Sequence, residues 1–306
     1  MSIESGNESN CLEQSGKCDT VELSILPKER DLGGFSVRRV LPAAKRKMIG
    51  PWIFFDHMGP ANFPPGEGID VRPHPHINLA TVTYLFEGEM FHRDSLGNAL
   101  AICPGDINLM IAGKGIVHSE RQRDEVKRAN HHIEGLQLWL ALPESDEEME
   151  PEFHHYNASD LPETTVDGVP VKVLIGSAYG VTSPVKAFAE TLYVEANLKQ
   201  GQSLSLPEST EQRGLYIVDG RLNTNGNELE AYSMTIFHPG KVATVTAEID
   251  TKLVIIGGEP LPLRHLWWNF VSSRQERIES AKNNWKNGRF PKVPGDEIEF
   301  IPLPED

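Results

Sequence analysis

Two short stretches of the chain, His74-Pro75-His76 and His118-Ser119-Glu120, indicate both its fold and the position of its functional site. Both have β-strand character, and in a strand residues i and i+2 point to the same face of the sheet. Each stretch therefore presents two metal-binding side chains to one face. A single His-x-His stretch is more often structural, but a second such stretch favours a metal site. The sequence predicts a site of three imidazoles and one carboxylate, formed by His74, His76, His118 and Glu120.

The residues between and around these stretches indicate an all-β fold. Turn signals such as Glu87-Gly88, residues 95–98 and Pro104-Gly105-Asp106 separate short apolar runs, so a meander can bring the two stretches side by side. Alternating polar and apolar residues predict strands at 35–40 and 78–85, and more follow in the second half. No amphipathic helix of ten residues or more is indicated before residue 142.

The second half of the chain repeats the pattern of the first. The stretch Tyr84–Gly88 matches Tyr216–Gly220. About ten residues later in each half, the turn residue Asn98 matches Asn227. A repeat of about 130 residues predicts two similar β-domains. The repeat lacks the metal ligands, because Leu206 and Glu208 stand where His74 and His76 are expected.

These patterns divide the chain of 306 residues into four parts. Residues 1–20 form a polar tail expected to be disordered, and residues 21–142 form the metal-binding barrel. Residues 143–165 are an acidic linker of solvated character. Residues 166–306 form a second barrel without metal ligands and a C-terminal helix, which is predicted to begin with a capping box at Ser273–Glu276 and to pack through Ile278, Ala281 and Trp285.

Composition narrows the classes of partner. A formal net charge of −15 argues against direct binding to nucleic acid, which needs clustered Lys and Arg. Three scattered cysteines do not make a disulfide framework. The sequence shows neither a secretory signal pattern nor 18 consecutive apolar residues, so a cytoplasmic protein without membrane spans is expected. Small molecules, cations or basic proteins remain as partners, and a monomer is expected.

With its duplicated β-barrel pattern and its His-x-His and His-x-Glu stretches, the chain resembles the cupin superfamily and, within it, the pirin family of bicupins. The resemblance extends from about residue 23 to the end of the sequence. Its most specific segments are 55–60, 72–76, 84–88, 92–98, 104–106, 112–120, 135–139, 214–216, 257–260 and 268–270. It implies two tandem cupin barrels, of the double-stranded β-helix or jelly-roll type.

The resemblance also implies a mononuclear iron centre in the first barrel, on the four residues that spacing predicts: His74, His76, His118 and Glu120. Ligand type alone would equally suit manganese, nickel, copper, zinc or cobalt. The chain departs from the family after His76, where residues 77–80 read Ile-Asn-Leu-Ala instead of Arg-Gly-Phe-Glu. A ligand carboxylate at position 80 is therefore excluded. The departure changes the rim of the site and leaves the substrate open.

The resemblance leaves two functions open. Some pirin-like proteins are similar to quercetin 2,3-dioxygenases, which open a flavonol ring with molecular oxygen and release carbon monoxide. In that case the chain is an oxidoreductase with Fe(II) and oxygen, and Glu120 is the base that removes the flavonol hydroxyl proton. The alternative is a non-enzymatic iron-binding regulator or adaptor that acts through protein partners, as a transcriptional coregulator does. His92 is either a residue lining the site or a surface residue, and His57 is expected to make a structural hydrogen bond.

Overall fold

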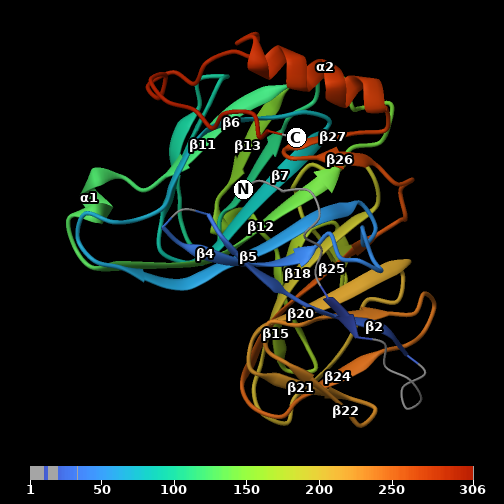
Figure 1. Ribbon diagram of the computed structural model, residues 1–306. Helices are drawn as coiled ribbons and strands as arrows, with labels where there is room; N and C mark the ends of the chain where they lie inside the picture. Colours follow the sequence, from blue (N-terminus) through green and yellow to red (C-terminus); the bar gives the residue numbers. More distant parts are fainter. Residues whose placement is uncertain (1–9, 13–19, 33, 306) are drawn as a thin grey trace.

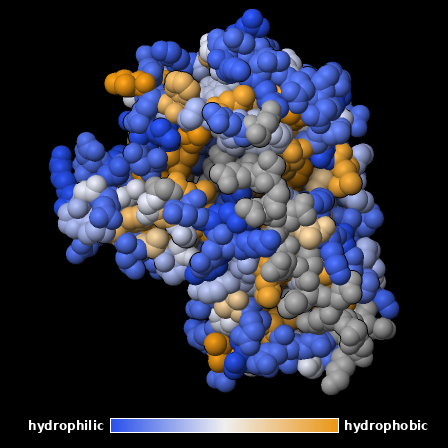
Figure 2. All heavy atoms as spheres, viewed as in Figure 1, coloured by the Kyte–Doolittle hydropathy of each residue, from blue (hydrophilic) through white to orange (hydrophobic). Residues whose placement is uncertain are grey.

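The computed structural model describes residues 10–12, 20–32 and 34–305 as an all-β protein with two lobes (Figure 1). Each lobe is a barrel made from a large and a small antiparallel sheet. Two α-helices occur in the described residues, α1 (Asp124–Lys127) and α2 (Gln275–Lys286), and neither is long and apolar enough to span a membrane. The face seen in Figure 2 is largely hydrophilic, as the net charge of −15 leads one to expect.

The first barrel encloses the two histidine-containing stretches, 74–76 and 118–120, between two sheets. The seven strands of the large sheet are, in spatial order, β13 (Glu152–Tyr156), β10 (Ile107–Ile111), β7 (Leu79–Glu87), β12 (His131–Ala141), β5 (Trp52–Phe63), β4 (Ser36–Leu41) and β3 (Lys28–Asp31). The four strands of the small sheet are β6 (Asp70–His76), β11 (Ile116–Arg121), β8 (Met90–Asp94) and β9 (Ala99–Ile102).

The second barrel repeats this plan. Its large sheet contains β1 (Asn10–Leu12), β2 (Val21–Leu26), β23 (Met234–Phe237), β20 (Gln212–Asp219), β25 (Thr251–Gly258), β18 (Thr191–Leu198), β15 (Val169–Ile175) and β14 (Glu163–Val166). Its small sheet contains β19 (Ser203–Ser205), β24 (Thr244–Ala247), β21 (Arg221–Thr224) and β22 (Asn227–Glu230). Outside the barrels lie the hairpins β16 (Ser177–Ala178) with β17 (Val181–Thr182) and β26 (His265–Trp267) with β27 (Phe270–Ser272), and the 3-10 turn Ala158–Asp160.

The two large sheets pack face to face, so their central strands are buried on both sides. In β12, Leu136 and Leu138 face the second barrel, whereas Trp139 faces the interior of the first. This explains why β7 and β12 read as nearly continuous apolar runs. The shared core contains Phe55, Tyr84 and Leu136 from the first barrel and Tyr193, Tyr216 and Val254 from the second. The indole Nε1 of Trp52 also donates to the carbonyls of Leu192 and Gly257, each at 3.1 Å.

The barrels exchange segments, and the boundaries expected at 21–142 and 166–306 do not allow for this. Strand β2 pairs with β23 and so belongs to the second barrel, where Figure 1 shows it among the C-terminal strands. In return, β27 contacts β6 and β7, and α2 packs beside it over the first barrel. Of the tail expected to be disordered, residues 1–9 and 13–19 lie outside the described residues, and β1 pairs with β2. Sequence periodicity carries no information about which barrel a strand joins.

The acidic linker is more ordered than its charge suggests. Its strand β13 pairs with β10 in the first barrel. Glu147 is only 1% exposed and forms an ion pair with Arg264 at 2.9 Å, so the expectation of a solvated loop is wrong at this residue. The Ser273 hydroxyl also donates to Glu147, at 2.8 Å. For this reason the predicted capping box is wrong too: α2 begins after Arg274 without a side-chain cap, although Ile278 is buried as expected.

Candidate metal centre

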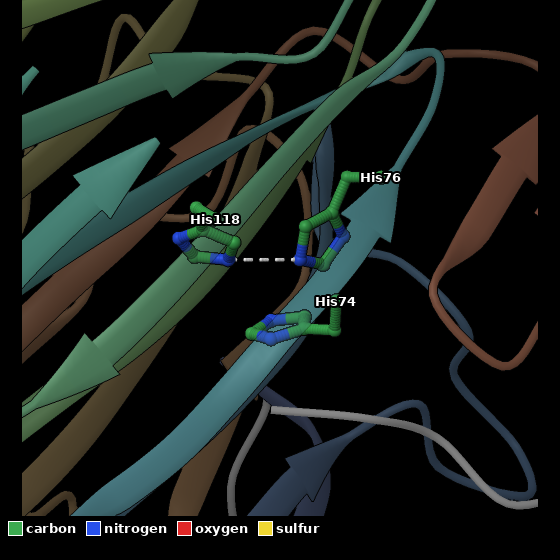
Figure 3. A group of neighbouring side chains, drawn as sticks. All are labelled: His74, His76 and His118. Carbon is green, nitrogen blue, oxygen red and sulfur yellow. Dashed lines mark hydrogen bonds between the residues drawn. The ribbon is translucent and has the colours of Figure 1, made fainter. Parts of the chain in front are cut away.

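Three histidines meet inside the first barrel because β6 and β11 pair antiparallel with His74 directly opposite His118. Two residues further along β6, His76 points to the same face (Figure 3). The ring centroids are 4.4 Å apart for His74 and His118 and 5.0 Å apart for His76 and His118. One ring nitrogen from each histidine lies within 4.8 Å of the other two. Strand alternation in the sequence predicted this convergence.

The spacing of the ring nitrogens suits a first-row divalent ion. The Nε2 atoms of His76 and His118 face each other at 3.1 Å, shown by the dashed line in Figure 3. Imidazole nitrogens bind zinc, for example, at about 2.0–2.1 Å, so two nitrogens at right angles on one ion lie about 3.0 Å apart. The Nε2 of His74 is buried and has no hydrogen-bond partner among the described residues. One ring nitrogen from each of the three histidines thus points toward a common position.

Backbone carbonyls fix the tautomers of two of these histidines. The Nδ1 of His74 lies 2.9 Å from the carbonyl oxygen of Arg72, and the Nδ1 of His76 lies 3.2 Å from that of Asn269. A carbonyl oxygen only accepts, so Nδ1 carries the proton and Nε2 keeps its lone pair for a metal. Such outer hydrogen bonds orient metal-binding histidines in many proteins. Asn269 lies 193 residues from His76 in the chain, and no local sequence signal identifies it.

Burial keeps all three imidazoles neutral. It lowers the pKa of His74, His76 and His118 well below the ordinary value of 6.5, because the protein interior disfavours the charged form. The neighbouring rings lower the pKa of His118 further. Neutral imidazole is the form that binds metal. The site is therefore ready to bind an ion at neutral pH.

Glu120 follows on the same strand but occupies a different row of the sheet. A register shift separates it from His118: His118 faces His74, whereas Glu120 faces Val71. Glu120 is 1% exposed and pairs across to His92 on β8. Among the described residues, its carboxylate does not join the group of atoms within 4.8 Å of one another. Its roles as fourth ligand and as base stay predictions.

His92 lines the site and is not a surface residue. It is 3% exposed, its ring lies 5.4 Å from that of His118, and it stacks on Phe153 at 4.5 Å. Its Nε2 is 3.0 Å from the carboxylate of Asp94. Burial alone would raise the pKa of Asp94, but hydrogen bonds from His92 and Asn98 hold it below its ordinary value. Asp94 is therefore a carboxylate that holds the ring of His92 in place.

Two other residues, Trp139 and His57, lie at different distances from the histidine triad. Trp139 is fully buried and forms part of the site wall, because its ring lies 5.1 Å from that of His76. His57 lies away from the histidine triad, between the two barrels. Its Nδ1 contacts the Tyr216 hydroxyl at 2.9 Å and its Nε2 lies 3.4 Å from Glu134. The structural hydrogen bond expected for His57 is present.

Comparisons with known proteins agree with this architecture. Residues 34–140 match the family model for pirin and residues 193–291 match that for the pirin C-terminal cupin domain. A pirin-like protein from Caulobacter vibrioides is 43% identical over 288 residues, covering 93% of this chain and all of the relative.

Two solved structures of quercetin 2,3-dioxygenases from Acinetobacter baumannii are also similar. One is 35% identical with a TM-score of 0.86, covering 92% of this chain and 95% of the other. The second is 27% identical with a TM-score of 0.81, covering 87% and 96%. With two cupin barrels, a histidine triad in the first and matches over both halves, the chain belongs to the pirin family of bicupins.

Proposed function

We propose that this protein is an iron(II)-dependent dioxygenase that opens the heterocyclic ring of quercetin-like flavonols with molecular oxygen and releases one carbon as carbon monoxide. The convergence of three neutral imidazoles inside a buried barrel carries the proposal. The similarity of this chain, over 92% of its length, to a solved quercetin 2,3-dioxygenase supports the choice of reaction. Both histidine spacing and ligand type also suit manganese, nickel, copper, zinc or cobalt, and we choose iron because the reaction uses oxygen.

His74, His76 and His118 would hold the ion through Nε2. Three protein nitrogens leave positions open, which is what separates a catalytic metal site from a closed structural one. Bound ferrous iron would supply a Lewis acid for the flavonol oxygens and a redox centre for oxygen. The carbonyls of Arg72 and Asn269 keep the rings of His74 and His76 from turning away.

Glu120 is the proposed base for the 3-hydroxyl proton of the flavonol. It is buried and lies two residues after His118, on the strand that supplies a metal ligand. Removing this proton makes the ring electron-rich enough to react with oxygen. The stacked rings of Phe54 and Trp139, 4.1 Å apart, give the barrel interior an aromatic wall suited to a flat substrate. Burial also keeps bulk water from the deprotonated substrate.

Oxygen uptake by protein reconstituted anaerobically with ferrous iron, measured after quercetin and then oxygen are added, tests this function. We expect oxygen consumption together with carbon monoxide release, both lost in His74→Ala. His265→Ala, which removes an exposed histidine outside the site, is the matched control and should keep both. Stoichiometric iron without turnover would contradict the enzyme proposal and favour a metal-dependent binding module that acts through protein partners.

A further inference from the structure

The inner face of the large sheet in the first barrel carries a row of polar side chains, one on each of six neighbouring strands. We call it the polar row. Its members, paired strand to strand in register, are Arg39 (β4), Asp56 (β5), Gln137 (β12), Thr83 (β7), Asn108 (β10) and His155 (β13). The row faces the metal-binding sheet, because Asp56, Gln137 and Asn108 are each two residues from a member of the inner core, Phe54, Trp139 and Met110.

Five of the six members of the polar row are buried, which is costly for polar groups that lack partners, and His155 at its end is half-buried. Gln137 is 1% exposed and Asn108 is 2% exposed. Neighbours within the row satisfy part of this demand. Arg39 donates to Asp56 through two bonds of 2.8 and 2.7 Å, and Thr83 donates to Gln137 at 2.9 Å.

The second barrel shows that the fold does not require this row. Its sheet has the same pairing, with Tyr216 in the place of Tyr84. The residues at the six corresponding register positions are Val173, Val194, Ile255, Leu215, Thr235 and Ser24. The first four belong to the apolar core of that barrel. Polar groups therefore occupy the centre of this row in the barrel that has the metal-binding histidines, and apolar groups occupy it in the barrel that lacks them.

The polar row lies one step along the strands from the wall of the metal site. The adjacent row on the same face includes Trp139 and Phe153, whose rings are close to His76 and His92. Two residues along a strand span about 7 Å. A flat ligand that reaches the metal with one end would thus extend its other end toward the polar row.

Two buried donors on this face have no acceptor among the described residues. They are Nδ2 of Asn108, whose Oδ1 already contacts His155 at 2.6 Å, and the indole Nε1 of Trp139. Buried groups of this kind usually have partners in native proteins. Donors without acceptors beside a candidate metal site indicate a ligand that carries oxygen atoms.

We propose that the polar row is the specificity surface for the substrate, and that Asn108 donates to a ring hydroxyl oxygen remote from the metal. This inference rests on the proposed function and narrows it. The protein selects aromatic substrates that carry several hydroxyl groups over aromatic substrates that carry only the oxygens that bind the metal.

Ligand binding separates this inference from turnover. The probes are quercetin and 3-hydroxyflavone, which lacks the remote hydroxyls, titrated into iron-loaded protein without oxygen. We expect Asn108→Leu to raise the Kd of quercetin roughly two- to tenfold, the effect of one lost hydrogen bond. The Kd of 3-hydroxyflavone and the iron content should not change. Thr235→Val, at the matching position of the second barrel, should change none of these values.

Asn108→Thr, which introduces the residue of the second barrel, is a second variant if Asn108→Leu does not fold, and should shift the Kd in the same direction. An unchanged Kd for quercetin, an equal loss for both flavonols, or no binding of either by the wild-type protein would overturn the inference. Selective loss of quercetin binding without any oxygen uptake would sustain the polar row and overturn the dioxygenase. Oxygen uptake by the wild-type protein, together with unchanged quercetin binding in Asn108→Leu, would support the dioxygenase and overturn the role of the polar row.

Discussion

Tyr84 and Tyr216 occupy equivalent positions in the two barrels, and their hydroxyls cross the interface in opposite directions. Tyr84 pairs across its sheet through Leu136 to His57, and Tyr216 pairs through Val254 to Glu195. The Tyr84 hydroxyl donates to Glu195, whereas the Tyr216 hydroxyl contacts His57. His57 and Glu195 therefore occupy equivalent positions in the two barrels, and each accepts the contact of the tyrosine from the other barrel. The two barrels are joined by one contact used twice, with different partners.

Removal of the Tyr216 hydroxyl should weaken this interface. We expect Tyr216→Phe to lower the free energy of unfolding by about 1–3 kcal/mol, because His57 would be left buried without that partner. Urea unfolding followed by fluorescence measures the effect. Tyr179→Phe, which loses a hydrogen bond to Ser205 in an exposed part of the second barrel, is the control and should cost less. Equal losses of unfolding free energy in the two variants would mean that the contact between Tyr216 and His57 stabilises the protein no more than an exposed hydrogen bond does.

His57 should make part of the stability depend on pH. Burial lowers its pKa below 6.5, although Glu134 acts in the opposite direction. The folded protein thus keeps His57 neutral where the unfolded chain, with an ordinary pKa of about 6.5, takes up a proton. Well above pH 6.5 His57 is neutral in both the folded and the unfolded state, so it adds no pH dependence to the free energy of unfolding. Below that pH the unfolded chain takes up the proton more readily, and the stability falls. His57→Gln keeps a polar partner for Tyr216 and should lose less stability between pH 7.5 and 5; an unchanged loss would contradict this origin.

The histidine triad should be necessary for metal binding. We expect His118→Ala to lose stoichiometric iron, because it removes the nitrogen that faces His76 at 3.1 Å. Ferrous iron should raise the melting temperature of the wild-type protein, since a ligand of the native state stabilises it, and should not raise that of the variant. Metal analysis and thermal unfolding under anaerobic conditions measure both. Full iron content in His118→Ala would exclude the site described above.

Glu120 should matter more for turnover than for metal retention. In Glu120→Gln the side chain keeps its size but can no longer take up a proton, so we expect turnover of quercetin to be abolished while part of the iron is retained. Single-turnover absorbance of the flavonol, compared with the iron content of the same sample, separates the two effects. Full activity in this variant would remove Glu120 from the mechanism.

The neighbouring residues Glu147 and Glu148 should differ sharply in their effect on stability. Glu147→Ala leaves Arg264, whose side chain is 1% exposed, as a buried charge without its partner, and we expect a loss of about 3–5 kcal/mol. Glu148→Ala removes a side chain that is 42% exposed and pairs with Arg274 and Arg277 at the surface, and we expect at most about 1 kcal/mol. Denaturant unfolding of both variants measures the difference. Similar losses would contradict the buried role of Glu147.

The sequence predicted those features that depend on local periodicity. Alternation in a strand places His74 and His76 on one face, and the repeated stretch at Tyr84 and Tyr216 reveals the second barrel. Features that depend on distant segments could not be predicted. Strand β2 can pair with either barrel as far as its own residues show, and only the fold places it beside β23.

Competition between partners explains the remaining errors. Ser273 has the residue type and spacing of a helix cap, but its hydroxyl donates to Glu147, which the charge of the surrounding linker suggested would be solvated. The carbonyl of Asn269 that holds His76 belongs to the backbone, so the type of residue at that position gives no signal. Glu120 could be recognised by its spacing from His118, whereas its place relative to the histidine triad depends on the register shift in β6.

The exchange of segments between the barrels would give metal loading an order in time. During synthesis, β6 and β11 leave the ribosome long before residue 269, whose carbonyl fixes the ring of His76. Until the hairpin of β26 and β27 has folded back, this imidazole is free to rotate and can present either nitrogen. We expect a chain whose hairpin of β26 and β27 has not yet folded back to hold an ion weakly and the folded chain to hold it tightly, so that tight binding would mark a polypeptide with this hairpin in place.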